Sequence, residues 1–341
     1  MKVKVKDIAA AAGVSPTTAS LVLNNKPSRI SDETREHILR VANEMRLQQE
    51  NDSLFTEYKR VKTIGLILPE GNNRFFQRMA LSVAEAADHS GYTVLQCNLN
   101  ADKNSFKRAI ESLVAKNVDG VIVVPPSKMD KENTKILKSL QTSKIPMMLL
   151  DRAVYSVFSD FVTADNKQGG RMITDYLIQK GHRKIGLLAG EEEVYTSRKR
   201  LEGYMASLAG HGIQFDSNLV YHGKFDAESG RVGAEILCQT GATAIFALND
   251  LMAYGVYQYA RENKLIIPED ISIIGYDNTE ICDLLEVPLT SVDQSVDTMA
   301  AKAVEIMIQQ IIEDEDQRTA RNYYFTPVLI ERESVKSLNE E

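Results

Sequence analysis

From Thr63 onward the chain alternates short apolar runs with amphipathic stretches, and this alternation restricts its fold more than any other feature. The apolar runs, which we expect to be strands, are Thr63–Leu68, Thr93–Cys97, Asp119–Val124, Pro146–Leu150, Lys184–Ala189, Ala244–Leu248 and Ser272–Tyr276. Helical spacing of apolar residues is found over Phe75–Ser90, Ser105–Asn117, Lys167–Lys180, Ser197–Gly210, Ala227–Gln239 and Leu251–Asn263. Strands that are apolar throughout and joined by helices predict parallel sheets covered on both faces.

About 280 residues follow Thr63, and the pattern starts afresh at Lys184, so two doubly wound lobes fit the length better than one. Later strand-like segments at Thr290–Val292 and Tyr323–Ile330 indicate that the chain crosses between the lobes more than once. We therefore expect a first lobe of residues 63–161 and 293–322, and a second lobe of residues 162–292 and 323–341.

The first 26 residues contain two short helical patterns, Val5–Ala12 and Pro16–Asn25. Gly13 supplies a sharp turn between them, and Ser15 is a predicted N-cap with Pro16 at the first helical position. Alanines on the first helix let the second pack closely, as in a helix-turn-helix that presents one helix to the DNA major groove. The alternative is an ordinary packed helical hairpin, but the second helix keeps polar residues where a core helix would be apolar.

A third helix is predicted to begin after Ser31, with acidic residues in its first turn. Its apolar residues, expected to close a three-helix core, are Ile38, Val41, Ala42 and Met45. We expect a small domain of residues 1–47, a hinge of residues 48–62 and a larger body of residues 63–341. A domain of that size buries little surface, so it is expected to be tethered to something larger.

The charge is unevenly distributed along the chain. The formal net charge is −7, yet residues 1–62 hold 11 Lys/Arg against 8 Asp/Glu, and the remainder holds 29 against 39. The modest basic excess lies on the small domain, where contact with phosphates would need it, whereas the body is acidic.

Composition excludes several classes of protein. The chain is 43% apolar and 26% charged, which is ordinary for a globular protein. Its three cysteines, Cys97, Cys238 and Cys282, have no metal-ligand spacing, which is typical of a reduced, cytoplasmic protein without a metal cofactor. There is no apolar run of 18 residues and no signal-peptide pattern, so we expect neither export nor a membrane partner.

Polar residues follow the predicted strands where each strand ends. These clusters are Glu70 with Asn72 and Asn73, Pro125–Ser127, Asp151–Arg152, Gly190–Glu191, Asn249–Asp250 and Asp277–Asn278. Ligands of doubly wound sheets bind outside the carboxyl ends of strands. No phosphate loop, nucleophile elbow or HExxH motif is found, and the five histidines are scattered, so an enzyme is not expected. Carboxylates, amides and an arginine near aromatic residues are suited to a polyol.

Several segments, in this order and spacing, resemble the lactose-repressor (LacI/GalR) family of bacterial transcription regulators. They are Val5–Ala9 with Ala12–Ser15, Asp151-Arg152, Asp165-Asn166 with Gly169-Gly170, Gly181–Ile185, Arg200–Tyr204, Ala244–Asp250, Pro268–Asp277 and Pro288–Gln294. The resemblance covers nearly the whole chain.

The resemblance implies a helix-turn-helix head, a hinge and a two-lobed sensor like a periplasmic binding protein. It also implies a homodimer on double-stranded operator DNA, most often as a repressor. A small-molecule effector would close the cleft between the lobes and alter how the heads fit their half-sites, a coupling of about 1–3 kcal/mol. The tail, Glu331–Glu341, has no leucine heptads that would build a four-chain bundle, so we expect a dimer.

Family roles carry over to individual positions of the sensor. Arg200 matches the arginine that reaches the effector, Asn249 and Asp277 match residues that bond effector hydroxyls, and Asp151 matches an acid at a strand end. Aromatic rings are implied at Phe225, Phe75 and Phe76, although Arg74 replaces the family's proline. The alternatives are core packing for Phe76 and Phe225, a structural ion pair for Arg200 and a turn cap for Asp277.

The predicted recognition helix departs from the family. Its candidate DNA contacts are Ser15, Pro16, Thr17, Thr18, Ser20, Leu21 and Asn24. Leu21 stands where relatives commonly have a guanine-reading arginine, and Pro16 offers no hydrogen bond, which leaves Thr17 as the main polar base reader. Thr18, Ser20 and Asn24 match positions that contact phosphates. We therefore expect an operator unlike the family's usual one.

The hinge departs further. Relatives place a leucine in the minor groove at the operator centre, but aligned without gaps this chain has Thr56 there. Glu50 and Asp52 would also lie near phosphates. Either Leu54 or Phe55 serves as the wedge in a shifted register, or the protein kinks DNA little; the second is slightly favoured.

Three other classes of protein share parts of this pattern. A periplasmic sugar-binding protein would share the sensor but needs a signal peptide and no helix-turn-helix. An enzyme of the doubly wound class needs a phosphate loop or a nucleophile. A relative that has lost sequence-specific reading would explain Pro16, Leu21 and the acidic hinge. A sugar or sugar derivative is the expected effector, nucleobases being less common in the family.

Overall fold

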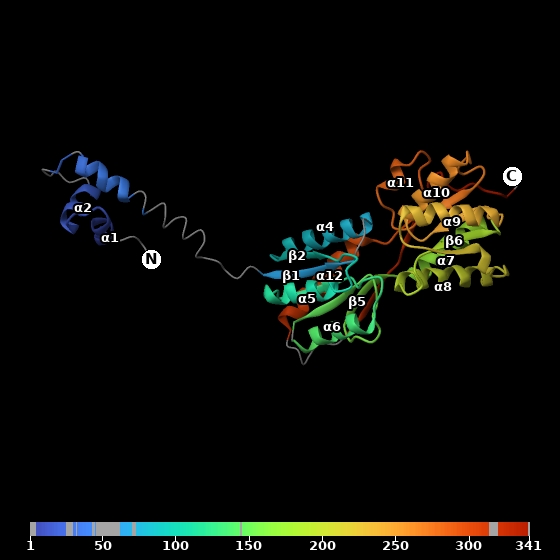
Figure 1. Ribbon diagram of the computed structural model, residues 1–341, viewed down its shortest axis with the longest axis horizontal. Helices are drawn as coiled ribbons and strands as arrows, with labels where there is room; N and C mark the ends of the chain where they lie inside the picture. The colour runs from blue at the N-terminus through green and yellow to red at the C-terminus, as the bar shows by residue number, and fades with distance from the viewer. Residues whose placement is uncertain are drawn as a thin grey trace. The chain divides into compact units, whose positions relative to one another are not determined.

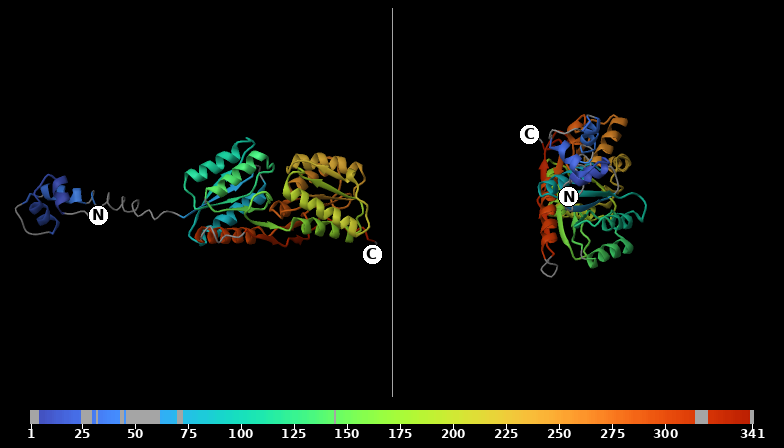
Figure 2. Two further views of the ribbon diagram at one scale, coloured as in Figure 1. Left: turned by 90° about the horizontal axis from the view of Figure 1, so that it is seen from below. Right: turned by 90° about the vertical axis from the view of Figure 1, so that its left-hand side faces the viewer.

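The computed structural model describes residues 5–24, 30–31, 33–42, 45, 62–69, 73–143, 145–313 and 320–339. The chain divides into two compact units, Met1–Val61 and Lys62–Glu341, which are drawn in Figures 1 and 2. Among the helices of these described ranges, none combines the length and the apolar character that a membrane span requires.

The first unit is a helical domain that contains α1 (Val5–Ala11), α2 (Pro16–Leu23) and a helix over 33–42. Gly13, in the turn between α1 and α2, has φ +65°, a conformation that glycine adopts without strain. Ser15 caps α2 by accepting a hydrogen bond from the Thr18 amide at 3.1 Å, as predicted. The core consists of Ile8, Ala9, Ala12, Ala19, Val22, Ile38 and Ala42.

The second unit contains two lobes, each built on a parallel sheet. The first lobe's sheet has the order β11-β5-β4-β3-β1-β2. Its strands are β1 (Thr63–Leu68), β2 (Thr93–Asn98), β3 (Gly120–Val123), β4 (Met147–Leu150), β5 (Asp160–Ala164) and β11 (Asn322–Phe325). Its helices are α4 (Arg74–His89), α5 (Ser105–Ala115), α6 (Lys131–Thr142) and α12 (Val296–Ile312).

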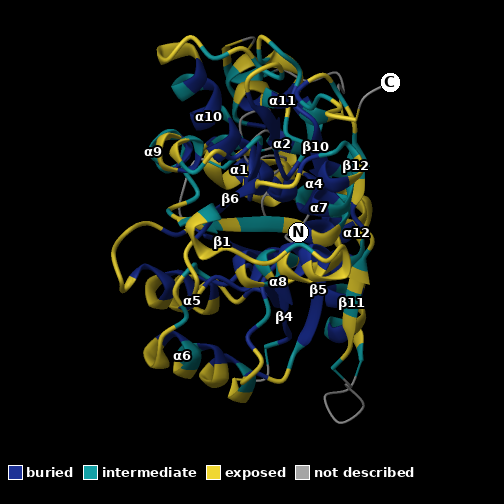
Figure 3. Ribbon diagram, turned by 90° about the vertical axis from the view of Figure 1, so that its right-hand side faces the viewer, coloured by how far each residue is buried: buried dark blue, intermediate teal, exposed yellow. Residues whose placement is uncertain are grey.

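Because the inner strands β1, β3, β4 and β5 are buried on both sides, helices cover both faces of the sheet. Met79 and Val83 of α4 pack with Met299 and Val304 of α12 on one face, together with Ile64 of β1. On the other face, side chains of α5 and α6 pack against the next residues along the strands. Figure 3 shows exposed residues on the outer sides of α5 and α6 and buried ones along β4 and β5.

The second lobe has a four-stranded parallel sheet of order β7-β6-β8-β9. Its strands are β6 (Ile185–Ala189), β7 (Val220–His222), β8 (Ala244–Ala247) and β9 (Ser272–Ile274), and a separate antiparallel pair is formed by β10 (Ser291–Asp293) and β12 (Val328–Ile330). Its helices are α7 (Asn166–Gln179), α8 (Tyr195–Gly210), α9 (Ala227–Gln239), α10 (Asp250–Glu262) and the short α11 (Ile281–Leu284). A 3-10 turn spans Ser217–Leu219.

The chain crosses between the lobes after β5, after β10 and after β11. The single strand predicted over Tyr323–Ile330 is wrong: β11 pairs with β5 in the first lobe, and β12 pairs with β10 near the second. Pro327 lies between the two strands and has no N–H to continue a ladder. Two crossings therefore lie about three residues later than the predicted lobe limits after residues 161 and 322.

We predict that Ile38→Ala unfolds the head alone. Ile38 is fully buried in a core of few residues, and such a truncation costs about 2–5 kcal/mol, which a small domain cannot absorb. Hydrogen exchange of the full-length protein should show lost amide protection in residues 5–24 and 33–42 and unchanged protection in the sensor. Leu39→Ala on the same helix, where Leu39 is 47% exposed, is the matched control and should retain head protection.

Candidate effector site and DNA-contacting helix

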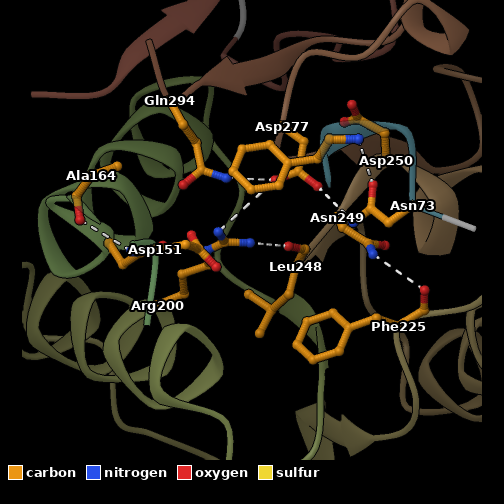
Figure 4. A network of polar contacts seen from close by, with 12 residues as sticks. Asn73, Asp151, Ala164, Arg200, Phe225, Leu248, Asn249, Asp250, Asp277 and Gln294 are labelled. Atoms are coloured by element: carbon orange, nitrogen blue, oxygen red, sulfur yellow. Dashed lines mark hydrogen bonds and ion pairs between the residues drawn. The ribbon is translucent and has the colours of Figure 1, made fainter. Parts of the chain in front are cut away.

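A cavity of about 270 Å³ lies between the two lobes of the second unit. The first lobe contributes side chains from the N-terminus of α4 and the ends of β3 and β4, and the second lobe contributes side chains from α8 and the ends of β8 and β9. All seven residues predicted for effector binding line it: Phe75, Phe76, Asp151, Arg200, Phe225, Asn249 and Asp277. Figure 4 shows how five of them converge with their polar partners.

Asp277 follows β9 and has φ +106°, an uncommon conformation for a residue with a side chain. Its Oδ1 accepts a hydrogen bond from Gln294 Nε2 at 2.6 Å, and its Oδ2 accepts one from Asn73 Nδ2 at 3.3 Å (Figure 4). Asn73 caps α4 of the first lobe, whereas Gln294 lies in the second crossing. The carboxyl of Asp277 therefore connects the second lobe to the first lobe through Asn73 and to the second crossing through Gln294.

Burial raises the pKa of Asp277 to about 8, because a charged carboxylate is disfavoured away from water. The nearby acid Asp250 raises the pKa further, and the guanidinium of Arg200 opposes the rise. Burial also raises the pKa of Asp250, although its oxygens accept hydrogen bonds from Ser291 Oγ and from the amide and hydroxyl of Thr279. These bonds hold the turn that presents Asp277.

Arg200 is 4% exposed, and two of its three guanidinium nitrogens donate hydrogen bonds within the protein. Nε donates to Asn166 Oδ1 at 2.8 Å, and Nη1 donates to the Leu248 carbonyl. Nη2 lies 3.9 Å from Asp277 Oδ1, which is too long for a strong pair. The guanidinium also lies 3.5 Å from the centre of the Tyr276 ring, a cation–π contact.

Asp151 and Arg152 form a buried pair at the end of β4, with 3.6 Å between Oδ2 and Nε. Burial raises the pKa of Asp151 and lowers that of Arg152. Arg152 Nη1 donates to the Pro125 carbonyl at 3.0 Å and to Ser127 Oγ at 3.4 Å. Within the part of the chain that the structure describes, Asp151 Oδ1, Arg152 Nε and Gln294 Oε1 have no hydrogen-bond partner.

The three aromatic residues line the cavity and also pack in a hydrophobic core, the alternative that the sequence left open for Phe76 and Phe225. Phe75 and Phe76 pack edge to face at 5.2 Å and belong to the core of the first lobe, while also lining the cavity. Phe225 packs against both cores of the second lobe, where its ring rests on Gly190 so closely that a methyl group there would overlap it. Asn249 caps α10 and also donates to the Phe225 carbonyl at 3.3 Å.

Seven further residues line the cavity. Asn73, Ser127 and Arg152 belong to the polar clusters predicted at strand ends, but they were not assigned to effector binding. No such role was assigned from the sequence to Thr196, Asp226, Leu251 and Gln294. Most lie within a few positions of a predicted residue, and Thr196 lies one helical turn before Arg200. Proximity to a predicted strand end, or a spacing of one helical turn from a predicted residue, could therefore have identified these residues from the sequence. In the described segments, no group of three His, Cys, Asp or Glu residues is arranged to hold a metal ion.

On the predicted DNA-contacting helix, Pro16 and Thr17 are exposed at the N-terminus of α2. Thr18, Ser20 and Leu21 are half-buried, because the same helix buries Ala19 and Val22 in the head core. Asn24 is exposed, and its Nδ2 donates to the Ser20 carbonyl at 2.9 Å. Leu54 and Phe55, the candidate hinge wedge, lie outside the described residues.

Comparison with known proteins identifies the family of the chain. The sequence profile of bacterial regulatory proteins of the lacI family matches residues 4–48, and that of the periplasmic binding protein-like domain matches residues 174–335. The HTH-type transcriptional repressor PurR of Photobacterium profundum is 32% identical over 337 residues, which are 98% of this chain and 99% of PurR.

Three solved structures are similar to the chain. A complex of the transcriptional regulator CelR with cellobiose has a TM-score of 0.73 at 26% identity, covering 98% of this chain and 100% of CelR. A LacI-family regulator from Enterococcus faecium with bound ribose has a TM-score of 0.73 at 26% identity, covering 82% and 100%. The lac repressor dimer bound to operator and the anti-inducer ONPF has a TM-score of 0.71 at 25% identity, covering 98% and 100%.

The chain belongs to the LacI family: it is a DNA-binding transcriptional regulator with a periplasmic-binding-protein-like sensor, and not an enzyme.

We predict that Asp277→Asn stabilises the sensor increasingly as the pH rises from 4 to 8. In this range the unfolded carboxyl, with an ordinary pKa of 3.8, has lost its proton while the folded one retains it, so the wild-type free energy of unfolding falls as pH rises. Asparagine does not titrate and tolerates positive φ. Urea unfolding should show an advantage of at least about 1.4 kcal/mol at pH 8, the value of one pKa unit.

Asp297→Asn is a control of opposite sign. Hydrogen bonds from Arg78 and Ser82 lower the pKa of Asp297, so its carboxylate stabilises the fold above the ordinary pKa and this contribution is lost as the pH falls. The Asp297→Asn protein should be less stable than wild type at pH 7 and should match it at low pH. A pH-independent difference for Asp277→Asn would contradict the assignment of a raised pKa to that carboxyl.

Proposed function

We propose that this protein is a homodimeric repressor whose affinity for its operator is controlled by a neutral monosaccharide bound in the cavity between the lobes. The observation that carries the proposal is the set of buried polar atoms in that cavity that have no hydrogen-bond partner: Asp151 Oδ1, Arg152 Nε and Gln294 Oε1. A buried polar atom without a partner costs about 1–3 kcal/mol, which a hydroxyl, both donor and acceptor, would remove.

The charges in the cavity favour an uncharged sugar over a sugar phosphate. Its acids are Asp151, Asp226 and Asp277, and its cations are Arg152 and Arg200. Both guanidinium groups already have acceptors within the protein: Arg152 donates to the Pro125 carbonyl and to Ser127, and Arg200 donates to Asn166 and to the Leu248 carbonyl. A phosphate brings between one and two further negative charges, and among the lining residues neither guanidinium is free of other acceptors to bind them.

The volume of the cavity favours a single sugar ring. Pockets for drug-sized ligands enclose about 300–1,000 Å³, and this cavity encloses about 270 Å³. Of the two sugar-bound relatives, the Enterococcus faecium regulator has ribose and CelR has cellobiose, a disaccharide. The rings of Phe76 and Phe225 give apolar faces against which the C–H surface of a small sugar packs.

Contacts between the lobes supply a route from ligand to DNA. Besides the bond from Asn73 to Asp277, Arg74 of α4 lies 3.8 Å from Glu280, and Arg78 lies 3.7 Å from Asp293 at the end of β10. Helix α4 directly follows β1, the first strand after the hinge. A ligand that binds one arrangement of these contacts more tightly shifts the population toward it, and thereby changes operator affinity.

At the DNA, Thr17 reads a base edge in the major groove, and Pro16 and Leu21 make apolar contacts such as those with a thymine methyl group. Ser15, Thr18, Ser20 and Asn24 fix the register on phosphates. The operator has two symmetric half-sites, because a homodimer, like the lac repressor dimer on its operator, imposes its two-fold axis on the DNA. As a DNA-binding regulator, the protein works in the cytoplasm.

We predict that ribose binds the full-length protein and changes its operator affinity, whereas ribose 5-phosphate and cellobiose do not bind. Titration calorimetry compares the three ligands, and a DNA-binding assay with ribose measures the change at the operator. Asp151→Ala should weaken ribose binding about 10- to 100-fold, since it removes a buried acceptor. Tighter binding of ribose 5-phosphate would overturn the neutral-ligand proposal, and a ribose affinity unchanged by Asp151→Ala would overturn the site.

We predict that Thr17→Ala relaxes sequence preference at one base pair of each half-site, by about 1–3 kcal/mol. Ser20→Ala on the same helix should instead weaken all sites alike, because phosphate contacts carry no sequence information. Both effects are measured by selecting sites from random duplex DNA at fixed salt, followed by binding to single-base variants. An unchanged site preference for Thr17→Ala would remove Thr17 from the base-reading role.

A further inference from the structure

The segment Asp165-Asn166 with Gly169-Gly170, at the start of α7, does not line the effector cavity. Asn166 is nevertheless 2% exposed and lies directly after the first crossing from β5 into the second lobe. A polar side chain that is so deeply buried at a crossing calls for a reason, because its amide must be fully hydrogen-bonded to be tolerated there.

The amide of Asn166 is bonded at both ends. Its Oδ1 accepts the bond from Arg200 Nε at 2.8 Å, and its Nδ2 donates to the Ala164 carbonyl at 3.1 Å and to Thr163 Oγ1 at 3.3 Å. The two ends cannot be exchanged, since a guanidinium only donates and a carbonyl only accepts. This orientation of the amide is therefore dictated by its neighbours.

The same bonds connect the two sides of the effector cavity. Thr163 Oγ1 donates to the Asp151 carbonyl at 2.8 Å. A continuous buried path thus runs from Asp151 in the first lobe, through Thr163 and Asn166, to Arg200 in the second. Figure 4 shows Asp151, Ala164 and Arg200 grouped on one side of the site.

The two glycines allow this close arrangement. A methyl group at Gly170 would overlap the Arg200 carbonyl, and one at Gly169 would overlap the hydroxyl of Tyr276, whose ring supports the Arg200 guanidinium. The backbone of helix α7 therefore lies directly against the backbone of Arg200 and the ring of Tyr276, and Asn166 lies at this contact.

We propose that Asn166 is a positioning residue for the effector site, which fixes the guanidinium of Arg200 relative to Asp151 across the crossing between the lobes. It touches no ligand and acts through Arg200. The distance between the acceptor Asp151 in the first lobe and the donor Arg200 in the second lobe is then fixed. Only a sugar whose hydroxyl groups match this distance can bind both. A test of this role by sugar binding rests on the proposed function, because it assumes that the cavity binds a sugar. A test that observes the position of the Arg200 guanidinium without ligand does not.

The first test observes Arg200 without ligand. In the full-length protein labelled with ¹⁵N-arginine, the Arg200 Nε–H signal, assigned by its loss in Arg200→Lys, should be protected from exchange with water. Asn166→Ala should abolish that protection. Thr174→Val removes another buried hydrogen bond of α7, from Thr174 to the Gly170 carbonyl, without touching Arg200, and should leave the signal unchanged. An Arg200 signal unaffected by Asn166→Ala would overturn the proposal.

The second test is a double-mutant cycle with ribose as the ligand. Asn166→Ala should weaken ribose binding about 10- to 100-fold in the wild-type background, the effect expected for a bond to a charged group. It should cost far less in the Arg200→Lys background, because lysine has no Nε–H to position. Equal costs in the two backgrounds would mean that Asn166 is merely structural, and would overturn the proposal.

If the wild-type protein binds no ribose, the proposed ligand is wrong, while the arginine signal still tests the role of Asn166. If Asn166→Ala does not fold, Asn166→Asp takes its place, because it keeps an oxygen for Arg200 Nε and loses the donors toward Ala164 and Thr163. It should retain the Arg200 signal, and loss of that signal would overturn the proposal.

Discussion

The sensor depends on one costly arrangement, the burial of acidic and basic side chains at the junction of its lobes. Asp151, Arg152, Arg200, Asp250 and Asp277 are all at most 6% exposed. Buried charges are tolerated only when they are paired and hydrogen-bonded, and here the pairs between carboxylates and guanidinium groups are long, at 3.6 and 3.9 Å. The raised pKa values of the carboxyls express this cost.

Sequence reasoning found most of the fold because most strands are apolar throughout. Strand β1 has the predicted bounds, Thr63–Leu68. Strand β5 was missed although it is buried, because Asp160 and Thr163 interrupt its apolar residues. Strand β7 was missed because it is short and half-exposed, and α6 because few of its side chains are apolar and buried. Helix α12 has the opposite character: it is apolar around much of its circumference, so it shows no clear helical period.

The site could be located from sequence because parallel strands end at one edge of their sheet. That rule, with the family resemblance, brought seven residues to one cavity. What the sequence could not predict is which of their atoms lack partners, since Arg152 Nε and Gln294 Oε1 are unpartnered only through the tertiary arrangement around them. The pKa of Asp277 likewise depends on burial by segments far apart in the chain.

The carboxyl of Asp277, which would bind a ligand, also connects the two lobes. A ligand hydroxyl would therefore compete with the residue of the other lobe for the same carboxyl oxygen. Asp277 accepts one bond from Asn73 of the first lobe and one from Gln294 in a crossing. A sugar hydroxyl that donates to Asp277 Oδ2 must displace the longer bond, the one from Asn73, or share its acceptor. Asn73 caps the helix that follows β1, the first described strand after the hinge in the sequence, so an exchange at this atom would act on the beginning of the sensor. A difference of one such bond is about 0.5–1.5 kcal/mol, which is comparable to the about 1–3 kcal/mol that typical allosteric coupling requires.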